Sequence, residues 1–209
     1  MSTAEPNGEN KRLSRRAIAA AATREEILRA ARRLFAERGY AATSVVEIAR
    51  AAGVSVPTIY ASVGTKAEVV MALVDLAGKE AGASRALAEV DRQTEPARLI
   101  HLGVRVNRLL EERGGEVREG LRSAAYSNPA ISAALAEGER RHRAGARRIA
   151  KRLAELNALR GGLEVNGATD AIALLTDAEC FARLRRYSWT FARAEAWIDA
   201  ALCRLLLRR

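Results

Sequence analysis

Apolar residues recur along most of the chain at the three- and four-residue spacing that places them on one face of a helix. The N-terminal part shows this spacing clearly, at Ile27, Ala31, Leu34 and Phe35. Later apolar runs and glycine or proline breaks predict further helices, each ending where the apolar spacing stops. These helices are expected over residues 99–110 with an end at the glycine pair 114–115, then at about 116–126, 129–157, 168–185 and 192–207.

The stretch from Thr43 to Lys66 contains the densest set of helix start and stop signals. Ser44 and Glu47 have the spacing of a capping box, in which each side chain accepts a hydrogen bond from the other residue's backbone N–H. Gly53 stands where a chain leaves a helix in the left-handed conformation, and Ser55 can cap the next helix. Two short helices joined by a tight turn are therefore predicted, the layout of a helix-turn-helix.

Two more capping boxes mark the helices on either side of this stretch. Thr23 and Glu26 start the preceding helix, and Thr65 and Glu68 start a fourth helix. The prediction is an all-α fold with three parts, listed in chain order. These are a disordered basic arm over residues 1–19, a helix-turn-helix domain over 20–66 with its linking helix at 66–82, and a helical domain over 83–209.

Positive charge is concentrated in the N-terminal part. The chain has a formal net charge of +10, and the segment from Lys11 to Lys66 holds eleven Lys or Arg against four Glu, a local net of +7. Such an excess favours a polyanionic partner. The basic arm, with Lys11, Arg12, Arg15 and Arg16, is either a solvated tail or a DNA contact. The arginines of residues 140–152 are interpreted as a solvated helix face, because acids alternate with them.

Several functional classes find no support in the residues. Cys180 and Cys203 lack disulfide or zinc-site spacing, so neither a metal nor a cofactor is expected, and a reducing cytoplasm fits. No run reaches the roughly 20 apolar residues that span a bilayer, so no membrane partner is expected. With His101 and His142 as the only histidines and no catalytic motif, the chain is not expected to be an enzyme.

The block from about Arg24 to Lys66 resembles the DNA-binding domain of TetR-family transcriptional regulators. The matching segments are ILRAARRLFAERGYAATS, EIARAAGVS and TIY, followed by Lys66 and the start of the fourth helix. The resemblance implies that the helix over 56–61 enters the DNA major groove. It also implies that Thr58 and Tyr60 touch phosphates or base edges, that Lys66 contacts phosphate, and that Ser44 lies where a helix N-terminus meets the DNA backbone.

Base reading is expected from the residues that project first from this helix, Ser55, Val56, Pro57 and Thr58. Few side chains here can make the bidentate hydrogen bonds that usually identify bases. Apolar contact with thymine methyl groups and DNA shape would then carry much of the specificity. Where the family commonly has a His-Phe pair after the tyrosine, this chain has Ser62 and Val63.

The resemblance also implies a homodimer that binds a palindromic operator in double-stranded DNA and responds to a small-molecule effector. Polar or aromatic residues that interrupt apolar helices are the effector-site candidates: His101, Arg105, Asn107, Arg122, Tyr126 and Phe181. The broad apolar stripe of the last helix gives the dimer candidates Trp197, Ala201, Leu202 and Leu205. Packing within the chain is the other interpretation of that stripe.

The expected function is therefore that of a ligand-responsive repressor. The alternative is a helical ligand-binding or interaction protein without specific operator binding, and a mobility-shift experiment separates the two.

Overall fold

The computed structural model describes residues 7–126 and 128–208, which form ten α-helices and no β-strand, so the all-α prediction is confirmed. None of these helices is both long and apolar enough to cross a membrane. In chain order they are α1 (Asn7–Arg38), α2 (Val45–Ala52), α3 (Val56–Ser62), α4 (Lys66–Glu80), α5 (Ala83–Val90), α6 (Pro96–Ala125), α7 (Pro129–Glu155), α8 (Val165–Leu175), α9 (Ala178–Arg186) and α10 (Phe191–Leu206).

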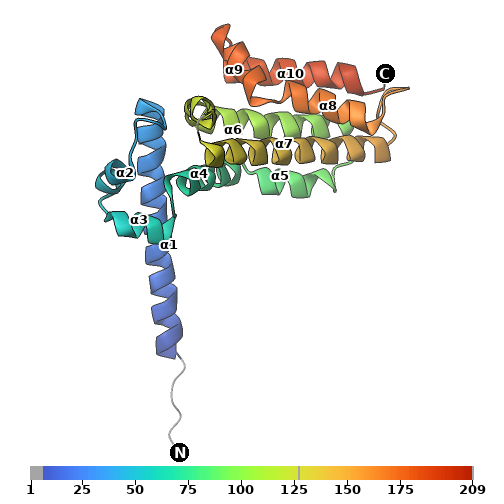
Figure 1. The fold of residues 1–209 in the computed structure, drawn as a ribbon. Helices are drawn as coiled ribbons and strands as arrows, with labels where there is room; N and C mark the ends of the chain where they lie inside the picture. The colour runs from blue at the N-terminus through green and yellow to red at the C-terminus, as the bar shows by residue number, and fades with distance from the viewer. Residues whose placement is uncertain (1–6, 127, 209) are drawn as a thin grey trace, which may run out of the picture.

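The helices form a small N-terminal unit joined to a layered C-terminal bundle (Figure 1). Helices α1, α2 and α3 make the N-terminal unit, and α4 leads from it to the bundle. In the bundle, α6 and α7 run side by side, with α4 and α5 on one side of them and α8, α9 and α10 on the other. The C-terminus lies at the end of the bundle away from α2 and α3.

The core of the N-terminal unit is completed by residues of the bundle. Ile27, Phe35, Ile48 and Ile59 are fully or almost fully buried in it, one or two from each of the first three helices. The same cluster also includes α4 residues and, from the bundle, Val117, Leu121 and Ala124 of α6 and Ile131 of α7. The helix-turn-helix is therefore held in place by α6 and α7, although the boundary predicted from the sequence lies before both.

A second core fills the part of the bundle farther from the N-terminal unit. It joins α6 and α7 to α8, α9 and α10 through fully buried side chains, listed as Leu99, Leu153, Phe181, Ile198 and Leu202. The chain end is fixed to this core by an isolated antiparallel bridge between Leu159 and Leu207. The predicted glycine linker at 161–162 lies between α7 and α8, and Gly162 has a φ of 80°.

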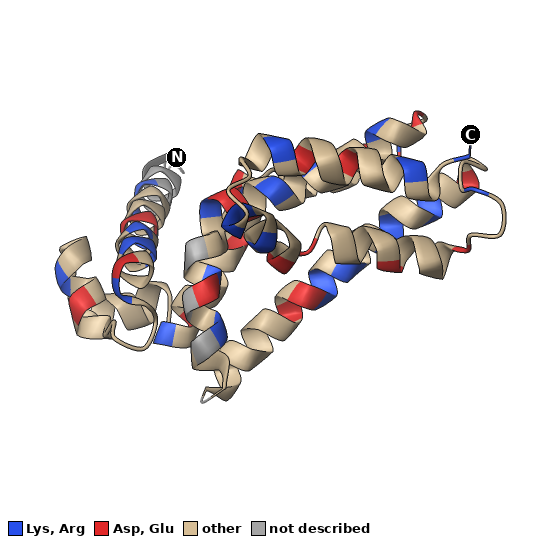
Figure 2. Cartoon of the chain, turned by 90° about the horizontal axis from the view of Figure 1, so that it is seen from above, with Lys and Arg blue, Asp and Glu red and all other residues tan. Residues whose placement is uncertain are grey.

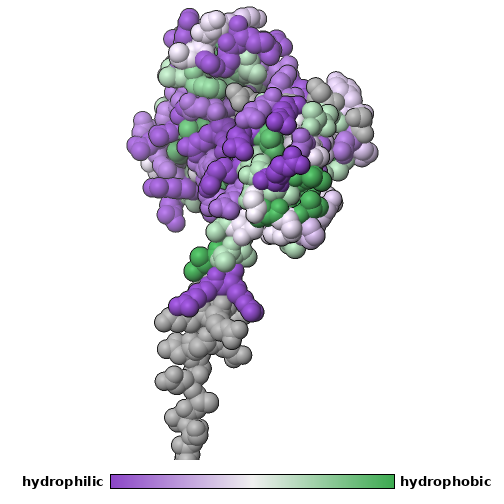
Figure 3. All heavy atoms as spheres, turned by 90° about the vertical axis from the view of Figure 1, so that its left-hand side faces the viewer, coloured by the Kyte–Doolittle hydropathy of each residue, from purple (hydrophilic) through white to green (hydrophobic). Residues whose placement is uncertain are grey.

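The first helix is longer than the sequence predicted. Of the disordered arm expected over residues 1–19, residues 1–6 lie outside the described residues, and α1 is helical from Asn7. Thr23 is therefore inside the helix and does not cap it. The alanine-rich stretch before Thr23 has high helix propensity, which continues the helix without tertiary contacts. Residues 15–22 are exposed, and this end of α1 projects from the body of the molecule (Figure 3).

Two further helix boundaries differ from those predicted. The pair Gly114 and Gly115 does not end a helix, because α6 continues through it. A Cβ added at Gly114 would lie 3.8 Å from the Ala77 Cβ, an ordinary van der Waals contact, so α6 passes α4 at this point without a break. The predicted helix over 168–185 is two helices, since the Asp177 carboxylate accepts from Glu179 N–H and caps a new one, α9.

Most of the arginines of α7 are exposed and paired with carboxylates, whereas Arg147 donates to the Asn166 amide oxygen. Acidic and basic residues are interspersed along the bundle helices (Figure 2). Arg140 and Arg141 pair with Glu137 on the same helix, and other α7 arginines reach neighbouring elements. These longer pairs are Arg141–Asp75, Arg143–Asp170 and Arg148–Asp91. An exposed ion pair contributes about 1 kcal/mol or less, so these pairs mainly neutralise the surface charge of α7.

Two glycines allow a matched test of the turn in the helix-turn-helix. Gly53 has a φ of 67°, which costs a residue with a Cβ about 1 kcal/mol or more. Gly138 lies in the middle of α7, and an added Cβ there meets no atom within 4 Å. We expect Gly53→Ala to lower the free energy of unfolding by about 1 kcal/mol and Gly138→Ala to raise it by up to about 1 kcal/mol. Urea denaturation measures both, and equal shifts in the same direction would contradict this explanation.

Candidate DNA interface and ligand cavity

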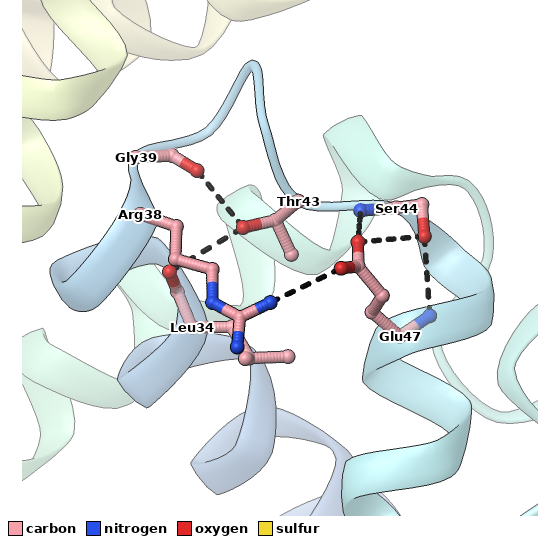
Figure 4. A network of polar contacts seen from close by, with 6 residues as sticks. All are labelled: Leu34, Arg38, Gly39, Thr43, Ser44 and Glu47. Atoms are coloured by element: carbon pink, nitrogen blue, oxygen red, sulfur yellow. Dashed lines mark hydrogen bonds and ion pairs between the residues drawn. The ribbon is translucent and has the colours of Figure 1, made fainter.

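The start of α2 is fixed by hydrogen bonds around Thr43 and Ser44 (Figure 4). The buried Thr43 hydroxyl lies 2.9 Å from the Gly39 carbonyl oxygen and 3.3 Å from that of Leu34, both at the end of α1. Ser44 N–H donates to the Glu47 carboxylate over 2.8 Å, and Glu47 N–H donates to the Ser44 hydroxyl over 3.2 Å. The predicted capping box is confirmed, and the Thr43 hydrogen bonds together with an ion pair between Arg38 and Glu47 over 3.2 Å tie α2 to α1.

The turn into α3 also follows the sequence prediction. Gly53 adopts the left-handed conformation, and Val54 N–H donates to the Ala49 carbonyl over 3.0 Å, which closes the end of α2. The Ser55 hydroxyl accepts from Thr58 N–H over 3.2 Å and caps α3. The orientation of α3 relative to α2 is thus set by backbone hydrogen bonds.

The exposed side of α3 carries most of the residues predicted to meet DNA. Ser55, Pro57 and Tyr60 are exposed, with 53% of Tyr60 accessible, whereas Val56 and Thr58 are half-buried. Ile59 is fully buried, as expected of a core residue. The predicted residues therefore share one surface, and Val56 also packs against the first core.

Few free hydrogen-bond donors remain at the start of α3. The Ser55 hydroxyl and the Thr58 hydroxyl lie 2.7 Å apart, and Ser55 already accepts from Thr58 N–H. Pro57 has no N–H. Contacts to DNA from this end of α3 would consequently be largely apolar, made by Val56 and Pro57, or made by a hydroxyl that exchanges its present partner.

Lys66, the first residue of α4, lies against an aromatic ring. Its Nζ is 4.0 Å from the ring centroid of Tyr40, a cation–π arrangement. Partial burial lowers the pKa of Lys66, and Glu47 opposes that shift. The Tyr40 hydroxyl in turn lies 3.4 Å from the Asn128 amide nitrogen, at the loop between α6 and α7. The predicted phosphate-contacting lysine is therefore positioned by residues from both parts of the chain.

Sequence reasoning missed two residues that position this surface. Arg24 donates to the Ser62 carbonyl oxygen over 2.5 Å and so ties α1 to the end of α3. Tyr40 supplies the ring beneath Lys66. No short-range pattern in the sequence connects Arg24 with residue 62, which lies 38 positions away.

The bundle contains a cavity of about 1180 Å³ that reaches α4, α5, α6, α7 and the turn between α8 and α9. Two of the six predicted effector residues, Asn107 and Arg122, line it. His101 and Arg105 lie elsewhere on α6, with His101 Nδ1 3.9 Å from the Asp199 carboxylate. Phe181 is fully buried in the second core and Tyr126 is 94% exposed, so neither has a place in the cavity wall.

His142, a lining residue that was not predicted, has a defined hydrogen bond. The Thr176 hydroxyl donates to the Ile172 carbonyl over 2.7 Å, so it accepts from His142 Nε2–H over 2.9 Å. Burial lowers the pKa of His142, and Asp177 opposes that shift. Neutral His142 with Nε2–H leaves Nδ1 as an acceptor.

The dimer candidates on α10 fall into two groups. Trp197 is 47% exposed, Leu205 is 43% exposed, and Ala201 is partly exposed, whereas Leu202 is fully buried within its own chain. Leu202 was predicted at an interface but belongs to the second core, because it lies on the inner side of the stripe. Leu174 of α8 is 72% exposed and was not among the predicted interface residues, which all lie on the last helix.

The capping boxes make the helix-turn-helix sensitive to acid. Hydrogen bonds from the backbone and hydroxyl of Ser44 lower the pKa of Glu47, and those of Thr65 lower the pKa of Glu68. Each carboxylate therefore stabilises the fold above its unfolded pKa of about 4.3, and this stabilisation is lost as the pH falls through the lower folded value.

We expect the double variant Glu47→Gln with Glu68→Gln to be less stable than wild type at pH 7, with the difference shrinking below about pH 4.3. Urea denaturation between pH 7 and pH 3 measures this. The control is Glu26→Gln with Glu37→Gln on α1, whose side chains hold no hydrogen bond or ion pair within the described residues. A difference that stays constant with pH would contradict the assignment.

Comparison with known proteins identifies the family of the helix-turn-helix domain. Residues 27–73 match the sequence pattern of the bacterial regulatory proteins of the tetR family. No curated protein matches the whole sequence or any part of it.

Solved structures of such regulators match almost the whole chain. A putative transcriptional regulator from Saccharomonospora viridis in complex with choline matches with a TM-score of 0.72 and 18% identity, over 90% of this chain and 100% of that one. NalD of Pseudomonas aeruginosa gives 0.68 and 22%, over 90% and 98%. A putative TetR-family regulator from Mesorhizobium loti gives 0.66 and 22%, over 90% and 98%. Residues 27–73 therefore form the N-terminal domain of the TetR family, in a chain with the fold of that family's transcriptional regulators.

Proposed function

We propose that the protein is a cytoplasmic, homodimeric transcriptional repressor that binds a palindromic DNA operator and is released by a small-molecule effector. One observation carries the proposal: α3 presents an exposed face on a helix-turn-helix whose core is completed by α6 and α7, two helices that also line a large cavity. The same two helices, α6 and α7, would then support the DNA-binding surface and line the ligand site.

On DNA, α3 would lie in the major groove. Tyr60, Lys66 and Ser44 position the protein on phosphates, and Ser55, Val56, Pro57 and Thr58 meet base edges. The exposure of Tyr60 and Pro57 supports these roles, as does the excess positive charge of the N-terminal part. Apolar contact and DNA shape account for much of the specificity, because α3 carries no Arg, Asn or Gln.

The dimer would form through α8 and α10, which are in contact with each other. Leu174, Trp197 and Leu205 are large apolar side chains that remain exposed on these helices, and Ala201 lies between the last two in the chain. Large exposed apolar residues that gather on neighbouring helices favour an interface. Two copies would place the two α3 helices about 34–36 Å apart, in successive major grooves.

The effector would act through α4. Val70 and Leu73 of this helix belong to the core of the helix-turn-helix and also line the cavity. A ligand that prefers the cavity shape of one orientation of α4 would shift the population towards that orientation. Structural relatives include a regulator bound to choline and a repressor of a multidrug efflux pump, which supports both a ligand and a repressing role.

The proposal is tested by electrophoretic mobility shift on the DNA upstream of the protein's own gene. We expect a shift that is sequence-selective and weakens steeply with salt. Lys66→Gln should weaken binding to operator and unrelated DNA about equally and reduce the slope of log K against log salt by about 1. Lys151→Gln, an exposed lysine on α7, is the control and should change neither.

A shift that is absent at physiological ionic strength would refute operator binding and favour the ligand-binding protein without DNA recognition. A Lys66→Gln effect confined to the operator would contradict the phosphate role alone.

The interface is tested separately by Leu174→Glu. A charge on this exposed side chain does not disturb the core, but it would be buried without a partner between two copies. We expect sedimentation velocity to show a dimer for the wild type and a monomer for the variant, with an unchanged circular dichroism spectrum. Ile18→Glu, which alters a similarly exposed apolar residue on α1, should remain dimeric. A dimeric Leu174→Glu protein would place the interface elsewhere.

A further inference from the structure

The wall of the cavity is aliphatic. Its apolar lining comes from Val, Leu, Ile and Ala side chains of α4 to α8, and no Phe, Tyr or Trp is among the lining residues that the structure describes. The only ring is that of His142. Stacking on a planar aromatic ligand therefore has no partner here, whereas a flexible or saturated ligand finds dispersion contacts on every side.

The cavity is also large and elongated. Its volume of about 1180 Å³ lies above the usual range of about 300–1,000 Å³ for small-molecule sites. Small residues on α7 leave part of this space, since a Cβ added at Gly138 would meet no atom within 4 Å and one at Gly145 would meet only a Leu87 methyl. The lining extends from Leu87 and Val90 on α5 to the start of α9, which suits a ligand with a long apolar body.

Most of the charged groups along the wall are already neutralised. Four lining arginines each pair with a carboxylate, as Arg118–Glu111, Arg122–Glu179, Arg141–Asp75 and Arg148–Asp91. Two lining cations, Lys79 on α4 and Arg113 on α6, have no carboxylate partner within the described residues. Two lining carboxylates, Glu139 on α7 and Asp177 at the start of α9, likewise have no ion-pair partner there, and they lie on other helices than these two cations. Both cations are exposed to solvent, on the edge of the cavity where α4 and α6 lie next to each other, and we call this edge the mouth of the cavity.

A third cation joins them there from the DNA-binding domain. Arg32 of α1 lines the cavity, pairs with Glu80 over 3.1 Å and donates to the Arg113 carbonyl oxygen, while the Arg113 guanidinium donates to the Glu80 carbonyl oxygen. The mouth thus holds three cations against one carboxylate. This local excess of positive charge adjoins an aliphatic interior.

We propose that the effector is an aliphatic amphiphile with an anionic head group, whose chain occupies the cavity and whose head binds Lys79, Arg113 and Arg32 at its mouth. The inference rests on the proposed function and specifies the chemistry of its effector. The head group would compete with Glu80 for Arg32, the cation contributed by α1. Binding at the mouth would then loosen the contact between α1 and the end of α4, which helps to fix the orientation of the helix-turn-helix.

Decanoate is the probe, with 1-decanol as its uncharged counterpart and proflavine as a planar aromatic cation. Isothermal titration calorimetry on the full-length protein, without DNA, measures binding directly. We expect decanoate to bind at least tenfold more tightly than 1-decanol and proflavine not to bind. Octanoate should bind about fifteenfold more weakly than decanoate, because it lacks two methylenes and each buried methylene contributes about a fourfold change in affinity.

Two variants separate the head group from the chain. Lys79→Glu should weaken decanoate binding about tenfold and leave 1-decanol unchanged, and Lys151→Glu, the same charge change on an exposed lysine outside the cavity, should alter neither. A Cβ added at Gly145 would lie 3.9 Å from a Leu87 methyl, so Gly145→Phe directs a ring into the cavity and should abolish binding of both. Thermal melting checks that each variant is folded.

Equal affinity for decanoate and 1-decanol, an equal effect of Lys79→Glu on both, or no binding of either would overturn the proposal. The result is independent of DNA binding. Decanoate binding without an operator shift would refute the regulatory function and keep this site, whereas an operator shift without decanoate binding would do the reverse.

Discussion

The position of the DNA-binding surface depends on one shared core. Ile48 and Ile59, the inner residues of α2 and α3, are buried in a cluster that α6 and α7 complete with Leu121 and Ile131. A three-helix unit of this size buries too little apolar surface to be rigid alone. The bundle therefore supplies part of the stability of the DNA-binding domain, and a displacement of α6 or α4 changes the packing beneath α3.

Sequence reasoning predicted the local structure of the helix-turn-helix because that structure depends on neighbours in the chain. The capping boxes at Ser44 and Thr65, the left-handed Gly53 and the cap at Ser55 all form between residues three or four positions apart or within a single turn. The same rule was wrong at Thr23. An N-capping residue marks the start of a helix only where the residues before it favour another conformation. Here the alanine-rich stretch before Thr23 is itself helical, so α1 starts earlier.

The cavity and the supports of the DNA-binding surface could not be found in this way, because they join residues far apart in the chain. Tyr40 lies in the turn after α1 and Arg24 lies on α1, and nothing in the sequence links them to Lys66 or to the end of α3. The effector site was predicted from polar and aromatic residues, whereas the cavity forms where small residues leave space between helices. Glycines such as Gly138, where an added Cβ would meet no atom within 4 Å, leave space beside the helix that carries them.

The two tryptophans of the chain, Trp189 and Trp197, lie edge to face with their ring centroids 5.9 Å apart. Arg193 lies over the ring of Trp189, its guanidinium carbon 4.0 Å from the centroid. Both rings stand at the start of α10, and neither lines the cavity or belongs to the helix-turn-helix. The intrinsic tryptophan fluorescence of this protein is consequently a local signal of the α9–α10 corner. It reports what covers Trp197, and it needs no added label.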